Sequence, residues 1–153
     1  RLGVVGLGGI KTELPLADWP EHKGWTWLVS GPGVPDRPDI VEIETIEGLT
    51  FSRALASADL VVTKPGYGTF VEAACAGVPV LYSRRDSWPE EPGLSAWLRA
   101  NSRAIALPRD QLFSGQFASE ANAVVARQAP PAPQPTGNEE AARIIDALIR
   151  SIH

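Results

Sequence analysis

The sequence predicts an α/β domain built on a doubly wound, parallel, six-stranded sheet. Six short apolar runs alternate with stretches of helical pattern, which is the arrangement of repeated βα units. Several of these runs are apolar without alternation, as expected for strands that are buried on both faces of a parallel sheet. The length of 153 residues is sufficient for one domain of this kind with a sizeable core.

Six predicted strands follow one another along the chain. The first, fourth and fifth runs have the continuous apolar character of buried strands, and the turn signal Gly31-Pro32-Gly33 closes the second. The third run is weaker. The expected strands lie at residues 2–7, 25–29, 39–43, 60–63, 78–82 and 104–107.

Helical patterns fill the segments between the strands. Residues 50–58 and 94–100 each place apolar side chains on one face of a helix, and residues 116–127 are weakly helical. Together with the parallel strands, these helices predict a Rossmann-like fold.

The helix with the clearest boundaries is predicted at residues 69–76. Thr69 can cap its start, and Glu72 stands three residues later, as in a capping box. Gly77 and then Pro79 end the helix.

The composition changes near the C-terminus. Residues 129–137 hold four prolines, which exclude a helix or a central strand and indicate a stiff, extended linker. A last helix is predicted at 138–153, with an apolar stripe on one face. The predicted organisation is a Rossmann-like domain at 1–128, the linker, and this helix, whose stripe is formed by Ile144, Ile145, Leu148, Ile149 and Ile152.

The composition excludes several classes of protein. No run approaches the ~18 apolar residues of a membrane span, and a single cysteine cannot form an internal disulfide. The net charge of −4 argues against a nucleic-acid partner. We therefore expect a reduced, cytoplasmic protein. Because the chain has no methionine and Arg1 leads directly into an apolar run, we also expect an N-terminal portion to precede residue 1.

Residues 59–79 carry the strongest functional signal. A buried strand is followed by the turn Lys64-Pro65-Gly66-Tyr67-Gly68-Thr69 and then by a helix. The amides of such a turn and the helix dipole form an anion site at the carboxyl edge of a sheet, and the two glycines let a ligand approach the backbone. Two plainer interpretations stay open: glycines serve turns in general, and Glu72 could act only in the capping box. The earlier Gly6-Leu7-Gly8-Gly9 lacks the full spacing of a dinucleotide fingerprint.

Basic residues follow three of the predicted strands. Lys11, Lys64 and the pair Arg84-Arg85 come after the first, fourth and fifth runs, so a parallel sheet gathers them along one edge of an acidic domain. A ligand with two phosphates would explain this grouping. Alternatively, the arginine pair is solvated and neutralised by the acidic residues at positions 86–91.

Residues 59–85 resemble the nucleotide-sugar-binding half of a GT-B glycosyltransferase, in particular the C-terminal domain of MurG-like N-acetylglucosaminyltransferases. They are also similar to the glycosyltransferase-like half of some sugar kinases, which carry a comparable Lys-Pro-Gly-Tyr-Gly turn. The resemblance implies that the domain is the C-terminal half of a GT-B fold. It further implies a preceding N-terminal domain that binds the acceptor, through which a peripheral membrane contact is left open.

The resemblance also implies a role for individual residues. The glycine pair after the first strand matches a loop that faces the diphosphate and the acceptor, and the turn 66–69 matches the loop and helix start that hold the diphosphate. Glu72 matches the acid that accepts hydrogen bonds from the ribose hydroxyls, and Lys64 occupies a basic, phosphate-facing position. Glu90-Glu91 stand where the family has two glutamines, so the donor sugar is open. The candidate substrate-binding residues are Gly8, Gly9, Lys64, Gly66, Tyr67, Gly68, Thr69, Glu72, Arg84 and Glu91.

The activity that the resemblance implies is metal-independent transfer of a sugar from a nucleoside diphosphate, with a UDP-linked sugar as substrate and no cofactor. The turn amides and Lys64 would stabilise the departing diphosphate. His22, expected in a polar surface loop, and the terminal His153 are poor candidates for the general base, which we expect on the preceding domain. The isolated chain is then expected to bind nucleotide without turnover. Three alternatives remain: an epimerase-like enzyme using Glu90 or Glu91, a silent nucleotide-binding module, and a domain whose turn only packs.

Overall fold

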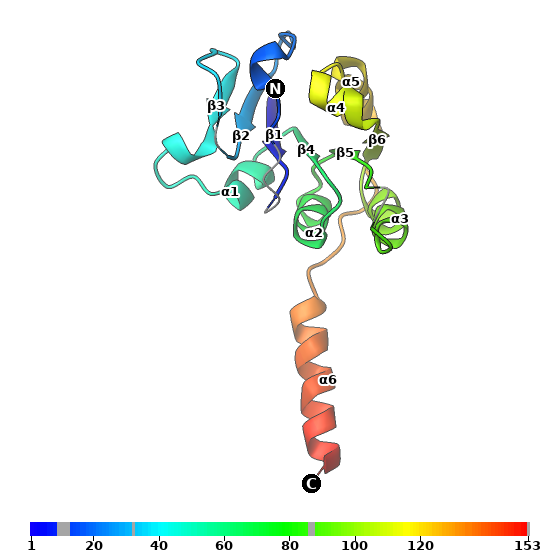
Figure 1. Ribbon diagram of the computed structural model, residues 1–153. Coiled ribbons are helices and arrows are strands. Elements are labelled where there is room, and N and C mark those ends of the chain that lie inside the picture. The colour runs from blue at the N-terminus through cyan, green and yellow to red at the C-terminus, as the bar shows by residue number, and fades with distance from the viewer. Residues whose placement is uncertain (9–12, 32, 86–87, 153) are drawn as a thin grey trace.

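The computed structural model describes residues 1–8, 13–31, 33–85 and 88–152, and these form a six-stranded parallel sheet (Figure 1). The strand order is β3-β2-β1-β4-β5-β6, so the direction of winding reverses between β1 and β4. All five strand pairings are parallel. The predicted Rossmann-like fold is therefore correct, and its strands are β1 (Leu2–Gly6), β2 (Thr26–Val29), β3 (Ile40–Glu42), β4 (Leu60–Thr63), β5 (Val80–Ser83) and β6 (Ala104–Leu107).

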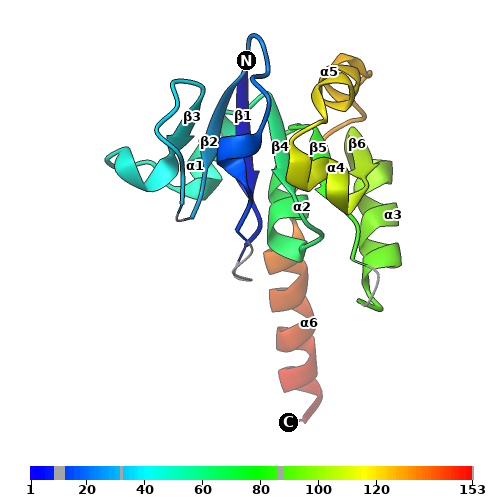
Figure 2. The ribbon, with the colours of Figure 1, turned by 45° about the horizontal axis from the view of Figure 1, so that its top comes forward.

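Helices cover both faces of the sheet (Figure 2). Helices α1 (Phe51–Ala56), α2 (Tyr67–Cys75) and α3 (Glu91–Asn101) pack on one face, where Phe70 and Leu98 are fully buried. Helices α4 (Arg109–Ser114) and α5 (Ala118–Ala126) pack on the other. Each face thus has its own apolar cluster, which accounts for the continuous apolar character of the central strands.

Two helices differ from the sequence prediction. Helix α2 begins at Tyr67 with Gly66 as its N-cap, so Thr69 lies inside the first turn and does not cap the helix. The predicted capping box is therefore wrong, because the chain becomes helical directly after the turn. Helix α4 was not expected. It follows Pro108, and Leu112 is its one buried residue, so its six residues carry no helical periodicity.

An aromatic layer fills the face of the sheet beneath α4 and α5. The ring of Trp27 stacks on Trp25 at 5.1 Å and meets Trp19 and Phe117 edge to face. All four side chains are buried. The clustered tryptophans therefore serve packing, and the edge-to-face contacts add to the apolar area that they bury.

His22 lies inside this aromatic layer, which corrects the prediction of a polar surface loop. It is 4% exposed, and its ring contacts Trp27 and Phe117. Its Nε2 lies 2.7 Å from the Gly115 carbonyl oxygen, and Nδ1 has no hydrogen-bond partner among the described residues. Burial lowers the pKa of His22 below its ordinary value, and the Gly115 carbonyl opposes this shift only in part.

Burial of His22 predicts a pH-dependent stability. Because its folded pKa is depressed, the unfolded chain takes up a proton first as the pH falls below ~6.5, and the free energy of unfolding decreases. His22→Phe should retain the packing and flatten this slope between about pH 7 and pH 5. Urea denaturation across that range measures the slope for both chains, and equal slopes would contradict the assignment.

Helix α6 (Gly137–Ile152) projects away from the sheet after an irregular segment at 127–136 (Figure 1). Its apolar stripe is exposed, with Ile144 at 62% and Leu148 at 58%. Within the described residues, no helix combines the length and apolar character that crossing a bilayer requires.

Candidate functional site

The candidate site lies where the winding of the sheet reverses. At the carboxyl ends of β1 and β4, the Thr63 hydroxyl donates a hydrogen bond to the Gly6 carbonyl over 2.7 Å and ties the two strands together. The chain then continues as Leu7-Gly8 on one side and as Lys64-Pro65 on the other. Open α/β sheets bind ligands at this position, because the flanking loops diverge there and leave a crevice.

Gly8 shapes one wall of the site. Its φ of +64° is a left-handed conformation that favours glycine. A Cβ at this position would lie 3.6 Å from Cε of Lys64. Gly8 and the Lys64 side chain therefore face each other across the reversal point. Gly9 and Lys11, also predicted to lie here, fall outside the described residues.

The turn before α2 presents backbone amides without side-chain caps. Gly66 is the N-cap, and the first intrahelical bond runs from the Phe70 amide to the Gly66 carbonyl over 3.1 Å. The amides of Tyr67, Gly68 and Thr69 therefore lack helical acceptors. Together with the helix dipole they form an anion-binding terminus.

The two glycines of this turn have no conformational or packing reason to be glycine. Gly66 has an extended φ of −167°, and Gly68 lies in the first turn of α2 without a positive φ. A Cβ at Gly68 would meet open space, and one at Gly66 would only touch a backbone oxygen at 4.0 Å. Gly68 is exposed at the start of α2, where glycine weakens the helix relative to alanine, so neither packing nor backbone conformation requires a glycine there.

A cleft of about 370 Å³ opens over this turn. Its volume lies within the range of small-molecule sites, roughly 300–1,000 Å³. Loops that follow β1, β4 and β5 form its walls. The cleft is lined by Leu7, Gly8, Thr63, Lys64, Pro65, Gly66, Tyr67, Thr69, Arg85 and Trp88.

Lys64, the first residue of the turn, carries its positive charge. Its side chain is half-buried, and burial lowers the pKa of its ammonium group, with the nearby Arg85 acting in the same direction. Both effects disfavour the charged form of the lysine. A bound anion would remove this penalty by supplying the opposite charge.

Two aromatic side chains and Arg85 form the outer wall of the cleft. Tyr67 meets Trp88 edge to face at 5.9 Å, and the Arg85 guanidinium lies 4.9 Å from the centre of the Trp88 ring. The Tyr67 hydroxyl donates to Glu90 over 3.0 Å, and this hydrogen bond raises the pKa of Tyr67. These contacts hold Arg85 on the cleft side of the loop.

The structure brings half of the ten predicted site residues together. Five line the cleft: Gly8, Lys64, Gly66, Tyr67 and Thr69. Gly68 is exposed on α2 and lies outside this lining. Glu72 is exposed on α2, one turn beyond Thr69 and on the same face of the helix.

Arg84 and Glu91 are arranged differently from the rest. Glu91 is 3% exposed, accepts a hydrogen bond from Ser95 over 2.9 Å and lies 3.7 Å from Arg84. The alternative pairing of this arginine with a nearby acid is thus present. Glu91 is directed into the domain and supports α3 and its neighbouring loop, while Arg84 stays exposed.

Sequence reasoning missed two residues of this region, Trp88 and Arg109, of which Arg109 begins the unpredicted helix α4. Arg85 is one of the cations that the sequence predicts at this edge of the sheet, and it lines the cleft. Arg109 follows the sixth strand as Lys64 follows the fourth. The rule that gathered the other cations would therefore have found it.

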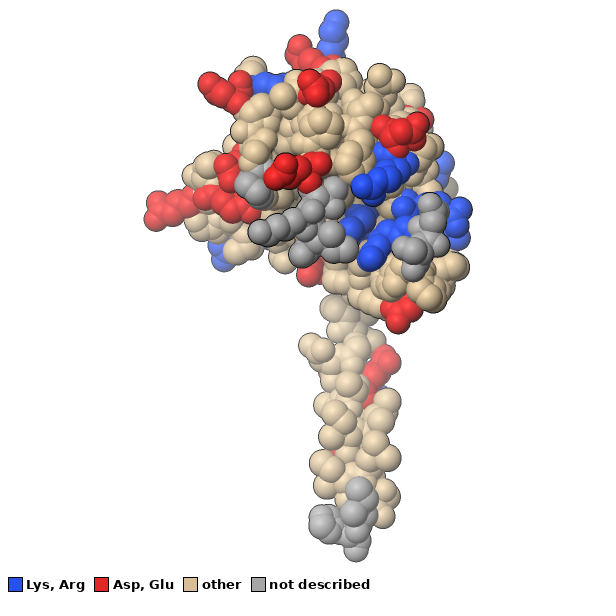
Figure 3. Space-filling view, in the orientation of Figure 1, with Lys and Arg blue, Asp and Glu red and all other residues tan. Residues whose placement is uncertain are grey.

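The charge distribution sets this region apart. Figure 3 shows Lys and Arg side chains gathered between the region of α4 and α5 and that of α3, while Asp and Glu lie mainly over the β2–β3 side. The domain is acidic as a whole, with a net charge of −4. A local basic surface at the cleft favours an anionic ligand.

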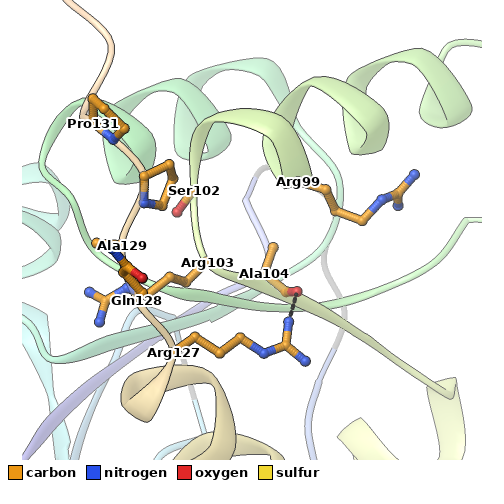
Figure 4. A pocket seen from close by; sticks show the side chains of 9 residues that line it. Arg99, Ser102, Arg103, Ala104, Arg127, Gln128, Ala129 and Pro131 are labelled. Carbon is orange, nitrogen blue, oxygen red and sulfur yellow. Dashed lines mark hydrogen bonds between the residues drawn. The ribbon is translucent and has the colours of Figure 1, made fainter.

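A larger cavity of about 600 Å³ lies at the opposite edge of the sheet (Figure 4). Two of its arginines bind main-chain carbonyls: Arg127 donates to Ala104, and Arg103 donates to Gly77 and Val125. They connect the end of α5 and the turn after α2 to the segment that enters β6. Their role there is structural.

The chain has a doubly wound, Rossmann-like α/β fold with a cleft at its switch point. No family model matches the sequence. Among solved structures, the chain is similar to the glycotransferase of kitacinnamycin, with a TM-score of 0.55 and 20% identity over 82% of this chain and 36% of the other. At this identity the likeness shows the fold. The comparison does not single out the MurG-like family.

A similar curated protein is the L-arabinokinase of Arabidopsis thaliana. It is 28% identical over 114 residues, which cover 74% of this chain and 11% of the arabinokinase. The chain therefore spans about a tenth of the length of that relative.

Proposed function

We propose that this chain is the donor-binding domain of a sugar-modifying enzyme, and that its cleft holds the diphosphate of a nucleoside-diphosphate sugar, UDP-linked in our expectation. The observation that carries the proposal is the convergence of three anion-binding features. The uncapped amides of α2, the half-buried Lys64 and the wall with Arg85 all face one cleft. The similarity to one glycosyltransferase fold and to one sugar kinase supports this class of substrate.

The diphosphate would lie over the start of α2. Amides 67–69 donate to its oxygens, and Lys64 and Arg85 neutralise its charge. Glycine at positions 66 and 68 leaves room for the phosphates against the backbone. Glu72, one turn further along α2, would accept hydrogen bonds from the hydroxyls of the attached ribose.

Sugar transfer would use the same donors. The bond from the anomeric carbon to the diphosphate oxygen breaks, and negative charge grows on the departing diphosphate. Fixed amides and Lys64 stabilise that charge without a metal ion. An acceptor hydroxyl supplies the new bond to the anomeric carbon, and its proton passes to a base that we place on a preceding domain. The chain alone should bind nucleotide and not turn it over.

A silent nucleotide-binding module is the second candidate, and Glu91 favours it. Where the resemblance expects an amide that holds the sugar, this chain has a carboxylate that is buried and engaged by Ser95 and Arg84. The same engagement argues against Glu91 as the acid or base of an epimerase. Hydrolysis or transfer of a UDP-sugar by the full-length protein separates the two candidates.

Gly68→Ala should change stability and affinity in opposite directions. Alanine in the first turn of α2 raises the free energy of unfolding by about 0.5–1 kcal/mol, while its methyl group occupies the space of the phosphates. A steric overlap of ~1–3 kcal/mol weakens UDP binding by roughly fivefold to 150-fold. Calorimetric titration with UDP, GDP and TDP measures the affinity, and urea denaturation measures the stability.

Gly93→Ala is the matched control. Gly93 lies in the first turn of α3, and its Cβ would also meet open space. Unlike Gly68, it is not flanked by residues that line the cleft. This substitution should stabilise the chain and leave UDP affinity unchanged. The proposal fails if Gly68→Ala behaves in the same way as Gly93→Ala.

A further inference from the structure

A second, smaller pocket of about 220 Å³ lies beside the cleft, between the end of β5 and α4. It shares Leu7, Lys64 and Arg85 with the cleft. Its volume is below that of sites that enclose a whole ligand, roughly 300–1,000 Å³. The pocket is therefore large enough for a single terminal group of a ligand and not for a whole ligand.

A buried hydroxyl in this pocket lacks a partner. Ser83, the last residue of β5, lines the pocket and is 6% exposed. Its Oγ has no hydrogen-bond partner among the described residues. Burial of a polar group without a partner is costly. An alanine at this position would pack equally well without that cost, so a ligand that hydrogen-bonds to the hydroxyl explains the serine better than packing does.

Four basic side chains reach the pocket from three separate segments. Lys64 follows β4, the arginine pair 84–85 follows β5, and Arg109 begins α4. The Arg109 guanidinium lies 4.4 Å from the centre of the Phe113 ring, which orients it along the pocket wall. None of the described residues that line the pocket is acidic, and the nearby Glu91 contacts Arg84 only at 3.7 Å.

We propose that this pocket binds a phosphomonoester at one end of the second substrate, the acceptor, while the expected preceding domain holds the rest of that molecule. The inference rests on the proposed function, which assigns the adjoining cleft to the donor. Cations from three directions and a hydroxyl suit a tetrahedral dianion with several acceptor oxygens, whereas a planar carboxylate is satisfied by one arginine. The shared Lys64 places the phosphate beside the donor diphosphate, as two substrates that exchange a group require.

Three side chains add an apolar wall to this pocket: Leu7, Leu112 and Phe113. They would contact the carbon atoms next to the phosphate. Both a phosphorylated sugar and a phosphorylated lipid carry such a group, and the shared chemistry is the phosphomonoester.

The test titrates the 153-residue chain, saturated with UDP, with glucose 6-phosphate and with vesicles containing phosphatidic acid. At least one probe should bind, which identifies the source of the phosphate. Ser83→Ala and Arg109→Ala should each weaken that binding about tenfold, as expected for loss of a hydrogen bond to a charged group, and leave UDP affinity within about twofold. Arg150→Ala on α6 removes one positive charge outside the domain and should change neither affinity.

The stability of Ser83→Ala separates a ligand role from a structural one. Without phosphate its melting temperature should equal or exceed that of the parent chain, because the substitution removes an unpartnered buried hydroxyl. The assignment is overturned if neither probe binds, if binding requires the absence of UDP, or if both variants bind normally. Should UDP fail to bind while glucose 6-phosphate binding still depends on Ser83 and Arg109, the proposed donor site is wrong and the phosphate pocket stands.

Discussion

Lys64→Met is expected to weaken the binding of UDP by roughly tenfold to a hundredfold at neutral pH. Methionine keeps the length and most of the apolar stem of the lysine and removes its charge. A hydrogen bond between charged groups contributes about 1.5–3 kcal/mol, and that loss corresponds to the stated range of affinity. Isothermal titration calorimetry at low ionic strength measures it, because salt screens the contribution.

The stability of Lys64→Met provides the control. Burial and Arg85 lower the pKa of Lys64, so the charged side chain is disfavoured in the free domain. The variant should therefore unfold at the same or a higher urea concentration than the parent. Lys23→Met, an exposed position outside the lining of the cleft, should affect neither quantity. If Lys64→Met binds UDP as tightly as the parent, the lysine does not contact the diphosphate.

Trp27→Ala is expected to lower the free energy of unfolding by about 3–5 kcal/mol, the usual cost of removing a large buried aromatic side chain. The indole is 1% exposed, stacks on Trp25 and meets Phe117 edge to face. It also fills the space beside Gly3, where a Cβ would lie 2.1 Å from Cζ3 of Trp27. Because whole domains are stable by only about 5–15 kcal/mol, this loss is severe.

Urea denaturation measures the free energy of unfolding of Trp27→Ala. An unchanged m-value would show that the substitution alters stability and not the surface exposed on unfolding. Trp97→Ala on α3 is a useful comparison, since Trp97 is only half-buried and should cost less. A loss below about 1 kcal/mol for Trp27→Ala, which is typical of ordinary substitutions, would show that the aromatic layer does not support the sheet.

The sheet could be predicted because its signal is local. Continuous apolar runs such as Leu60–Thr63 and Val80–Ser83 have one stable environment, the interior of a parallel sheet, and both are buried throughout. The position of the turn at 64–69 could be predicted as well, since a glycine-rich segment between a buried strand and a helical pattern marks the connection of a βα unit.

Other features depend on contacts distant in sequence. His22 lies between Glu21 and Lys23, a context that predicts exposure, yet Gly115 and Phe117 from the far end of the chain enclose it. Glu91 is buried because Ser95 and Arg84 surround it after folding. The sequence places the N-cap of α2 at Thr69, one helical turn too late, because the actual N-cap, Gly66, has no side chain that would mark it.

The sequence predicts the part of the site that lies around the turn 64–69, and it does not predict the neighbouring pocket. Lys64 and the residues at 66–69 belong to a single contiguous segment, so their proximity follows from the sequence. The pocket with Ser83 and Arg109 needs the placement of α4 against β5, which no local pattern encodes. A buried serine at the end of an apolar strand becomes informative only when its surroundings are known.

Backbone amide chemical shifts during titration with UDP test the central claim most directly. The account predicts saturable shifts concentrated at residues 66–70 and at Gly8, with smaller changes at Glu72 and the spectrum of α6 unchanged. Shifts that cluster instead around Arg103 and Arg127 at the opposite edge, or no saturable shifts at millimolar UDP, would contradict it.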